Sequence, residues 1–167
     1  MAGVILDAGH GGYDNGAQYD GRKEKDDNLR LTLAVGQILE QNGVPVSYTR
    51  QSDIYQSPSE KARLGNESGA DYFISFHRNA SPNANEYQGV ETLVFDDHGI
   101  KAEMARNVNA TKIPPFMPTA LAIHTNPPER PHSLIRALNM PTSSRITTTD
   151  TDVIEEIPRI ALSQNSL

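Results

Sequence analysis

Two short apolar runs, each ending at a histidine, constrain the fold of this chain more than any other feature. Residues 4–6 (Val-Ile-Leu) lead through Asp7 into a glycine-rich turn that contains His10. Residues 72–76 (Tyr-Phe-Ile-Ser-Phe) lead directly into His77. Apolar runs of this length, separated by a helical pattern, are typical of buried parallel strands. Because the carboxyl ends of such strands share one sheet edge, where ligands bind, we expect both histidines to face one crevice.

The order of the segments predicts an α/β fold of three layers, α/β/α, with a mostly parallel central sheet. A metal site is expected at the carboxyl ends of the strands. The expected strands are at about residues 3–7, 44–49, 71–76 and 89–95, and the expected helices at about 27–42, 57–68 and from about 100.

Two of these helices have clear sequence signatures. The second starts with Ser57 as N-cap, Pro58 at the first helical position and Glu60 as the returning side chain of a capping box. In the first, apolar residues recur at the spacing of one helical face. We expect this stripe to pack on the sheet: Leu31, Ala34, Val35, Ile38 and Leu39.

Composition narrows the kinds of site that the chain can carry. There is no cysteine, so disulfides and thiolate zinc sites are excluded, and any metal must be held by His, Asp or Glu. The net charge of −6 argues against nucleic acid as a partner. No apolar stretch approaches the ~20 residues of a membrane span. A chain of 167 residues is expected to form one domain, residues 1–167.

Residues 111–167 are atypical. Eight of the eleven prolines lie between Pro114 and Pro158, and residues 142–151 are mostly Ser and Thr. No helical or alternating pattern is sustained until residues 152–157, which suit either a strand or a helical turn. We expect this segment to be loop-rich or poorly ordered.

The two strand-end histidines suit a catalytic zinc site, which takes three protein ligands and leaves the fourth position to water. Glu24 is the best placed acid, because the helix that follows it must return across the edge carrying His10. A solvated surface glutamate is the alternative. Asp7 is expected either to accept the second ring N–H of a liganding histidine or to bond to backbone. The other histidines, in turn-like or proline-rich surroundings, are expected to be structural: His98, His124 and His132.

Several segments share their order with those of a known family. They are Leu6–Gly12 with Asp14 and Gly16, Glu24–Leu29, Tyr48–Arg50, Arg63 and Asn66 before Gly69–Asp71, Phe73–Ala80, and Gly89–Thr92. Over about residues 3–110, the chain therefore resembles the zinc-dependent N-acetylmuramoyl-L-alanine amidases, the cell-wall hydrolases of bacteria and their phages.

The resemblance implies that Zn²⁺ is the cofactor and that His10, Glu24 and His77 bind it. It implies peptidoglycan as substrate and hydrolysis of the amide that joins N-acetylmuramic acid to L-alanine of the stem peptide. We therefore expect action outside the cell, at the cell wall. The chain opens on a predicted strand without a signal region, so we expect a mature or excised domain, or export by a phage-type route.

The family's general base lies on a late strand that reads Met-Pro, four apolar residues and Glu. Met140 and Pro141 match its start, but residue 146, where the glutamate is expected, is isoleucine. Glu155 or Glu156 can take the role if residues 153–157 enter the sheet, and a solvated helix end is the alternative. Because a general base typically contributes ~10²–10⁴-fold to the rate, its loss would impair turnover without abolishing zinc binding.

Three functions remain open from the sequence. The first is a zinc-dependent peptidoglycan amidase. The second is a catalytically impaired amidase-like module that binds the cell wall or a partner protein. The third is a zinc peptidase on a similar fold, which would use the same metal ligands.

Overall fold

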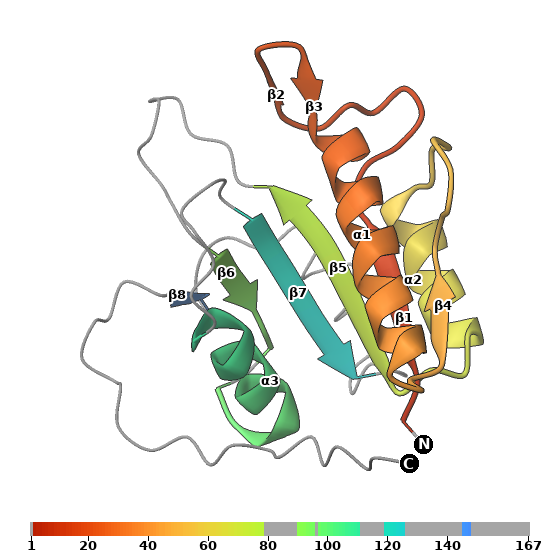
Figure 1. Cartoon of the computed structure of the whole chain (residues 1–167). Helices are drawn as coiled ribbons and strands as arrows, with labels where there is room; N and C mark the ends of the chain where they lie inside the picture. Colours follow the sequence, from red (N-terminus) through yellow and green to blue (C-terminus); the bar gives the residue numbers. More distant parts are fainter. Residues whose placement is uncertain (1, 79–89, 96, 111–118, 126–144, 148–167) are drawn as a thin grey trace.

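A six-stranded sheet between helices forms the centre of the molecule (Figure 1). The computed structural model describes residues 2–78, 90–95, 97–110, 119–125 and 145–147. The helices are α1 (Glu24–Gln41), α2 (Pro58–Glu67) and α3 (Gly99–Ala110). The strands are β1 (Val4–Ala8), β2 (Gln18–Tyr19), β3 (Arg22–Lys23), β4 (Val46–Tyr48), β5 (Tyr72–Arg78), β6 (Val90–Leu93), β7 (Thr119–Thr125) and β8 (Arg145–Thr147).

The large sheet has the order β4-β1-β5-β7-β6-β8, and β2 and β3 form a separate hairpin. β1 lies parallel to both β4 and β5, and β6 lies parallel to β7. The β5–β7 and β6–β8 pairs are antiparallel. The predicted α/β fold is therefore confirmed. The register pairs Ala8 with Phe76, so the chain leaves β1 toward His10 at the edge where β5 ends with His77 and Arg78.

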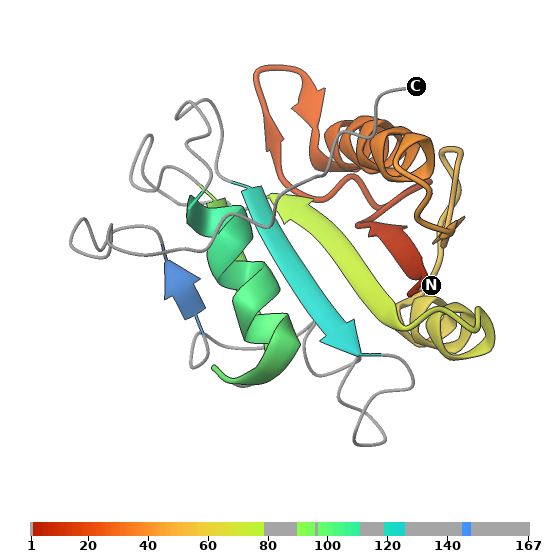
Figure 2. The ribbon, with the colours of Figure 1, turned by 60° about the horizontal axis from the view of Figure 1, so that its bottom comes forward.

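The helices form a layer on each face of the sheet. Val35 and Leu39 of α1 and Ala105 of α3 pack with Leu6 and Phe76 on one face. On the other face, Ala62 of α2 packs with Ile5 of β1 and Phe73 of β5. Figure 2 shows β1 between α1 and α2. No helix in the described part of the chain combines the length and apolar character that a membrane span requires.

The start of α2 follows the sequence signature. The side chain of Ser57 accepts a hydrogen bond from the backbone N–H of Glu60 at 3.2 Å, and Pro58 is the first helical residue. The predicted N-cap is confirmed.

The predicted apolar stripe of α1 is only partly the packed face. Val35 and Leu39 contact the core, but Leu31, Ala34 and Ile38 are exposed. The buried residues of α1 are mostly polar or small: Glu24, Lys25, Asn28, Thr32 and Gly36. The helix also begins three residues before its expected start. The prediction was wrong for Leu31, Ala34 and Ile38, because the first turns of this helix direct polar side chains inward, toward the loops at the sheet edge.

Three strand elements were missed by the sequence analysis. β7 and β8 lie in the segment that was expected to be loop-rich, and the β2–β3 hairpin lies in the glycine-rich loop. β7 pairs along its length with β5 and along four residues with β6. Its stability therefore comes from pairing with strands distant in sequence, which local patterns do not report.

A buried ion pair joins β1 to α2. The carboxylate of Asp7 is fully buried and accepts hydrogen bonds from Lys61 Nζ (2.7 Å), Thr49 Oγ1 (2.6 Å) and Ser75 Oγ (2.6 Å). Lys61 Nζ also donates to the carbonyl of Ala8 at 2.7 Å. Asp7 therefore takes neither of its expected roles, because side chains of β5, α2 and the segment after β4 occupy both its oxygens.

We predict that Asp7→Asn lowers the free energy of unfolding by about 3–5 kcal/mol, because it leaves the buried Lys61 ammonium without its counter-charge. Chemical denaturation followed by circular dichroism measures the change. Glu67→Gln is the matched control, since Arg63 and Glu67 form an exposed pair on α2 whose loss should cost less than about 1 kcal/mol. Equal effects of the two variants would contradict the prediction.

The loss of stability caused by Asp7→Asn should depend on pH. Burial alone would raise the pKa of Asp7, but Lys61 and the two hydroxyl donors outweigh it and lower this pKa below its usual 3.8. A carboxylate whose pKa is lower in the folded state than in the unfolded state stabilises the protein at pH values above its unfolded-state pKa. This contribution is lost as the pH falls toward the folded-state pKa. The difference between wild type and Asp7→Asn should therefore shrink below about pH 4.

Candidate metal centre

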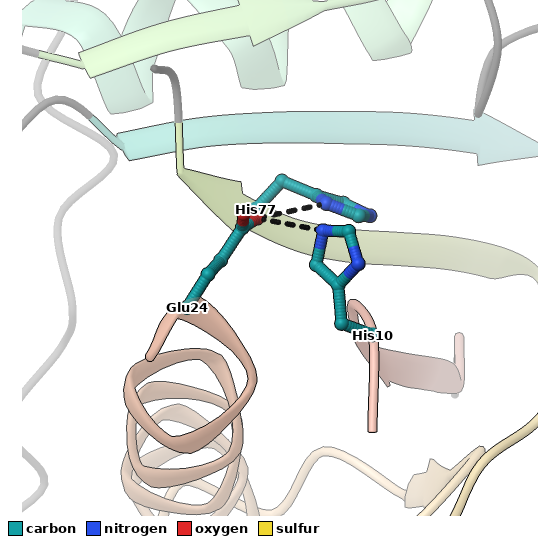
Figure 3. A group of neighbouring side chains, drawn as sticks. All are labelled: His10, Glu24 and His77. Atoms are coloured by element: carbon teal, nitrogen blue, oxygen red, sulfur yellow. Dashed lines mark hydrogen bonds and ion pairs between the residues drawn. The ribbon is translucent and has the colours of Figure 1, made fainter. Parts of the chain in front are cut away.

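Three side chains from three elements meet at the carboxyl edge of β1 and β5 (Figure 3). His10 comes from the loop after β1, Glu24 is the first residue of α1, and His77 lies near the end of β5. His10 Nε2 and His77 Nδ1 each lie 3.1 Å from Glu24 Oε1. The two rings meet edge to face with their centroids 4.9 Å apart. The structure thus brings together the three residues that the sequence analysis selected.

The spacing of these atoms suits a small metal ion. With bonds of about 2.0–2.2 Å, two neighbouring ligands of a tetrahedral zinc ion lie roughly 3.3 Å apart. Both nitrogen–oxygen separations on Glu24 are close to this value, and all three ligand atoms lie within 4.8 Å of one another. Two imidazoles and one carboxylate are donors that zinc accepts. The group could therefore hold a metal ion.

A short turn fixes the orientation of the His10 ring. His10 has a positive φ of 60°, which is uncommon for a residue with a side chain. Gly11 and Asp14 exchange backbone hydrogen bonds of 3.0 and 3.1 Å, and this places Asp14 Oδ2 2.9 Å from His10 Nδ1. When Nδ1 carries the proton and donates it to Asp14, Nε2 is left to bind an ion. The sequence analysis considered Asp7 for this role, as one of two alternatives, and did not consider Asp14 for it.

The carboxylate of Glu24 is held from several sides. The backbone N–H of Ala17 donates to Oε2, and that of Arg78 donates to Oε1, both at 2.8 Å. The side-chain amide of Asn28 donates to Oε1 at 3.2 Å. Burial alone would raise the pKa of Glu24, but hydrogen bonds from His10, His77 and these backbone groups hold it far below its usual range. Glu24 therefore stays ionised.

The electrostatics of the turn favour a positive charge between the rings. Burial would lower the pKa of His10, but Glu24 and Asp14 outweigh burial and raise it. Burial would raise the pKa of Asp14, and its bonds to His10 and to the Gly16 backbone lower it instead. The same two carboxylates that attract a proton to His10 would attract a metal cation.

The three ligand side chains meet in a space that is open because Gly9 and Gly16 have no side chains. A Cβ atom on Gly9 would lie 2.4 Å from the His77 ring. On Gly16, which has a positive φ of 62°, it would lie 2.6 Å from both Glu24 Oε2 and the His10 ring. Either added carbon would push the ligand side chains apart.

Arg50 and Lys25 tie the surrounding loops together. The buried guanidinium of Arg50 donates to the carbonyls of Ala8 (2.9 Å), Gly9 (3.0 Å) and Lys25 (2.9 Å). Lys25 Nζ donates to the carbonyl of Gly12 at 2.7 Å and pairs with Asp53 at 2.6 Å. These contacts join the end of β1 to the start of α1, so the ligands from both segments keep their relative positions.

The other residues considered from the sequence lie elsewhere in the described structure or outside the described residues. His98 is exposed and pairs with Asp97, and His124 lies in β7. Ile146, where a general base was expected, lies in β8, which is separated from β5 by β7 and β6. Three strand spacings amount to about 14 Å. The other two candidate bases and the last histidine lie outside the described residues: Glu155, Glu156 and His132.

Known proteins resemble the chain in sequence. Residues 4–149 match the family model described as N-acetylmuramoyl-L-alanine amidase. An endolysin of Bacillus phage SPP1 is 43% identical over 93 residues, which are 55% of this chain and 33% of that protein. The sporulation-specific N-acetylmuramoyl-L-alanine amidase of Bacillus subtilis (strain 168) is 37% identical over 101 residues, 59% of this chain and 38% of the relative. The chain thus spans little more than a third of the length of these two relatives.

Solved structures share the fold. The N-acetylmuramoyl-L-alanine amidase from Clostridium difficile 630 superposes with a TM-score of 0.56 at 27% identity, over 73% of this chain and 77% of that one. AmiC2 of Nostoc punctiforme gives a TM-score of 0.57 at the same identity and coverage. Because the family model matches most of its length, the chain belongs to the N-acetylmuramoyl-L-alanine amidase family.

Proposed function

We propose that this chain hydrolyses the amide between N-acetylmuramic acid and L-alanine of peptidoglycan, with zinc held by His10, Glu24 and His77. The observation that carries the proposal is the His-Glu-His group at the sheet edge, in a chain of this family. Relatives named as a phage endolysin and a sporulation-specific amidase support cell wall as the place of action. The site therefore acts outside the cytoplasm, on the wall.

The residues of the site have separate tasks in this reaction. A zinc ion held by His10, Glu24 and His77 would polarise the amide carbonyl and would lower the pKa of its bound water toward ~7. Glu24 supplies the negative charge, and its backbone donors keep it in place. Asp14 keeps the His10 proton on Nδ1, away from the ion. Three protein ligands leave one position for water or substrate.

The proton acceptor is proposed to be Glu155 or Glu156. In the described part of the chain, Glu24 is the one carboxylate in the metal group, and its hydrogen bonds hold it ionised as a ligand. Position 146 carries isoleucine and lies in β8, away from β5. This substitution also favours a second candidate function, a module that binds the wall or a partner without cutting.

Zinc analysis of the purified protein tests the ligand set. We expect about one zinc per chain in wild type and little in His77→Ala, because two remaining ligands bind zinc weakly. His98→Ala is the matched control, since His98 is exposed and pairs with its neighbour Asp97. Equal zinc contents in wild type and His77→Ala would reject the proposed site.

Removal of the Asp14 carboxylate should weaken zinc binding without abolishing it. A group that orients a metal-ligating histidine typically contributes 10–100-fold to metal affinity, so we expect a loss of roughly this size for Asp14→Ala. Titration against a competing chelator measures it, with Asp97→Ala as the exposed control. An unchanged affinity would show that the His10–Asp14 contact does not act on the metal.

Release of free L-alanine amino termini from purified cell wall tests the reaction. We expect one of the two variants Glu155→Gln and Glu156→Gln to remove the general base. That variant should release amino termini ~10²–10⁴-fold more slowly than wild type, with its zinc content unchanged. If neither variant slows release, both candidates are wrong. If zinc-loaded wild type binds wall but releases no amino termini, the non-enzymatic function is correct.

A further inference from the structure

We propose that three arginines gathered around Asp27, beside the metal centre, bind a free carboxylate of the stem peptide. The inference rests on the proposed function and adds a substrate-selecting subsite to it. The arginine cluster, as we name it, consists of Arg22 in β3, Arg30 in α1 and Arg78 at the end of β5.

One carboxylate holds the arginine cluster together. Arg22 Nη2 lies 3.0 and 3.1 Å from the two oxygens of Asp27. Arg30 donates to Oδ1 of Asp27, and Arg78 donates to Oδ2. The three guanidinium groups come from three different elements, so the cluster is assembled by the fold and not by one helical face.

Several positive charges meet at this position. The guanidinium groups of Arg22, Arg30 and Arg78 share the carboxylate of Asp27, in a chain whose net charge is −6. Arg22 and Arg78 both donate to the carboxylate of Asp27, so like charges are crowded together. An added anion would relieve this repulsion. Guanidinium groups present paired donors that match the two oxygens of a carboxylate.

The arginine cluster also lies next to two of the proposed metal ligands. Arg78 directly follows His77, and its backbone N–H donates to Glu24 Oε1 at 2.8 Å. The Arg78 side chain is 17% exposed, partly withdrawn from water, and those of Arg22 and Arg30 are 50% and 74% exposed. A charged contact that is partly shielded from solvent is stronger than one at the open surface.

Stem-peptide chemistry supplies a carboxylate close to the scissile bond. Each residue spans at most about 3.6 Å, so the residue after L-alanine lies within one or two residue lengths of the metal centre. That residue is a glutamate linked onward through its side chain, and its α-carboxyl group is free in some walls and amidated in others. The arginine cluster would favour the free acid and discriminate against the amide.

A matched pair of synthetic muropeptides tests this inference. N-acetylmuramyl-L-alanyl-D-isoglutamate carries the free carboxylate, and its D-isoglutamine counterpart carries the amide. For the zinc-loaded wild type we expect kcat/KM to be about 10-fold or more higher for the acid, since charge-assisted pairs with arginine are about twice as strong as neutral ones. In Arg78→Gln the ratio should fall toward one through a lower rate on the acid, with zinc content unchanged.

Controls separate a binding role from a structural one. Arg63→Gln, at an exposed pair on α2, should keep the wild-type ratio. Arg30→Gln removes an exposed member of the cluster and should partly reduce the ratio of kcat/KM for the acid to that for the amide. It therefore tests the cluster even if Arg78→Gln fails to fold. Equal wild-type rates on the two muropeptides, or a preference that survives both cluster substitutions, would overturn the inference.

The outcome is separable from that of the proposed reaction. If wild type cleaves neither muropeptide, calorimetric titration of the same pair into the zinc-loaded protein measures the preference as a ratio of Kd values. Tighter binding of the acid that is lost in Arg78→Gln supports the subsite even when the amidase function fails. Equal Kd values overturn the subsite.

Discussion

The candidate site depends on a single buried carboxylate, that of Glu24. A buried negative charge is unfavourable unless it is paired and hydrogen-bonded, and here backbone N–H groups from the turn before α1 and from β5 supply the bonds. The two histidine rings approach the same oxygen from the remaining sides. The position of Glu24 therefore fixes the distance between the loop after β1 and the end of β5.

Buried polar contacts in the surrounding fold help to keep these groups together. Asp7 and Lys61 join β1 to α2 directly beneath the turn, and Arg50 joins the end of β1 to the start of α1. A buried polar network contributes little to stability when some of its groups lack hydrogen bonds. When every group is hydrogen-bonded, the network favours a single arrangement of the residues around it. They also explain why the inward face of α1 is polar: Asn28 and Lys25 point toward loops that carry the site.

Sequence patterns predicted the parts of the molecule that depend on local order. The strands before His10 and His77, their parallel pairing and the cap at Ser57 follow from apolar runs and capping residues. Glu24 was selected because a helix beginning near it must cross the sheet edge. The rest depended on contacts between distant segments. β7 is stabilised by β5 and β6, and Asp14 reaches His10 only because the turn folds back on itself.

The first turns of α1 combine several tasks in five consecutive positions. Glu24 faces the histidines, Lys25 the Gly12 loop, Asp27 the arginine cluster and Asn28 the carbonyl of Gly9. Inserting or deleting one residue there would rotate everything beyond it by about 100° and misdirect these contacts together. The tip of the preceding hairpin borders open space, since a Cβ atom at Gly21 would meet no other atom within 4 Å, although its positive φ of 73° favours glycine there. Variation in chain length among relatives should therefore concentrate at that tip and avoid the start of the helix.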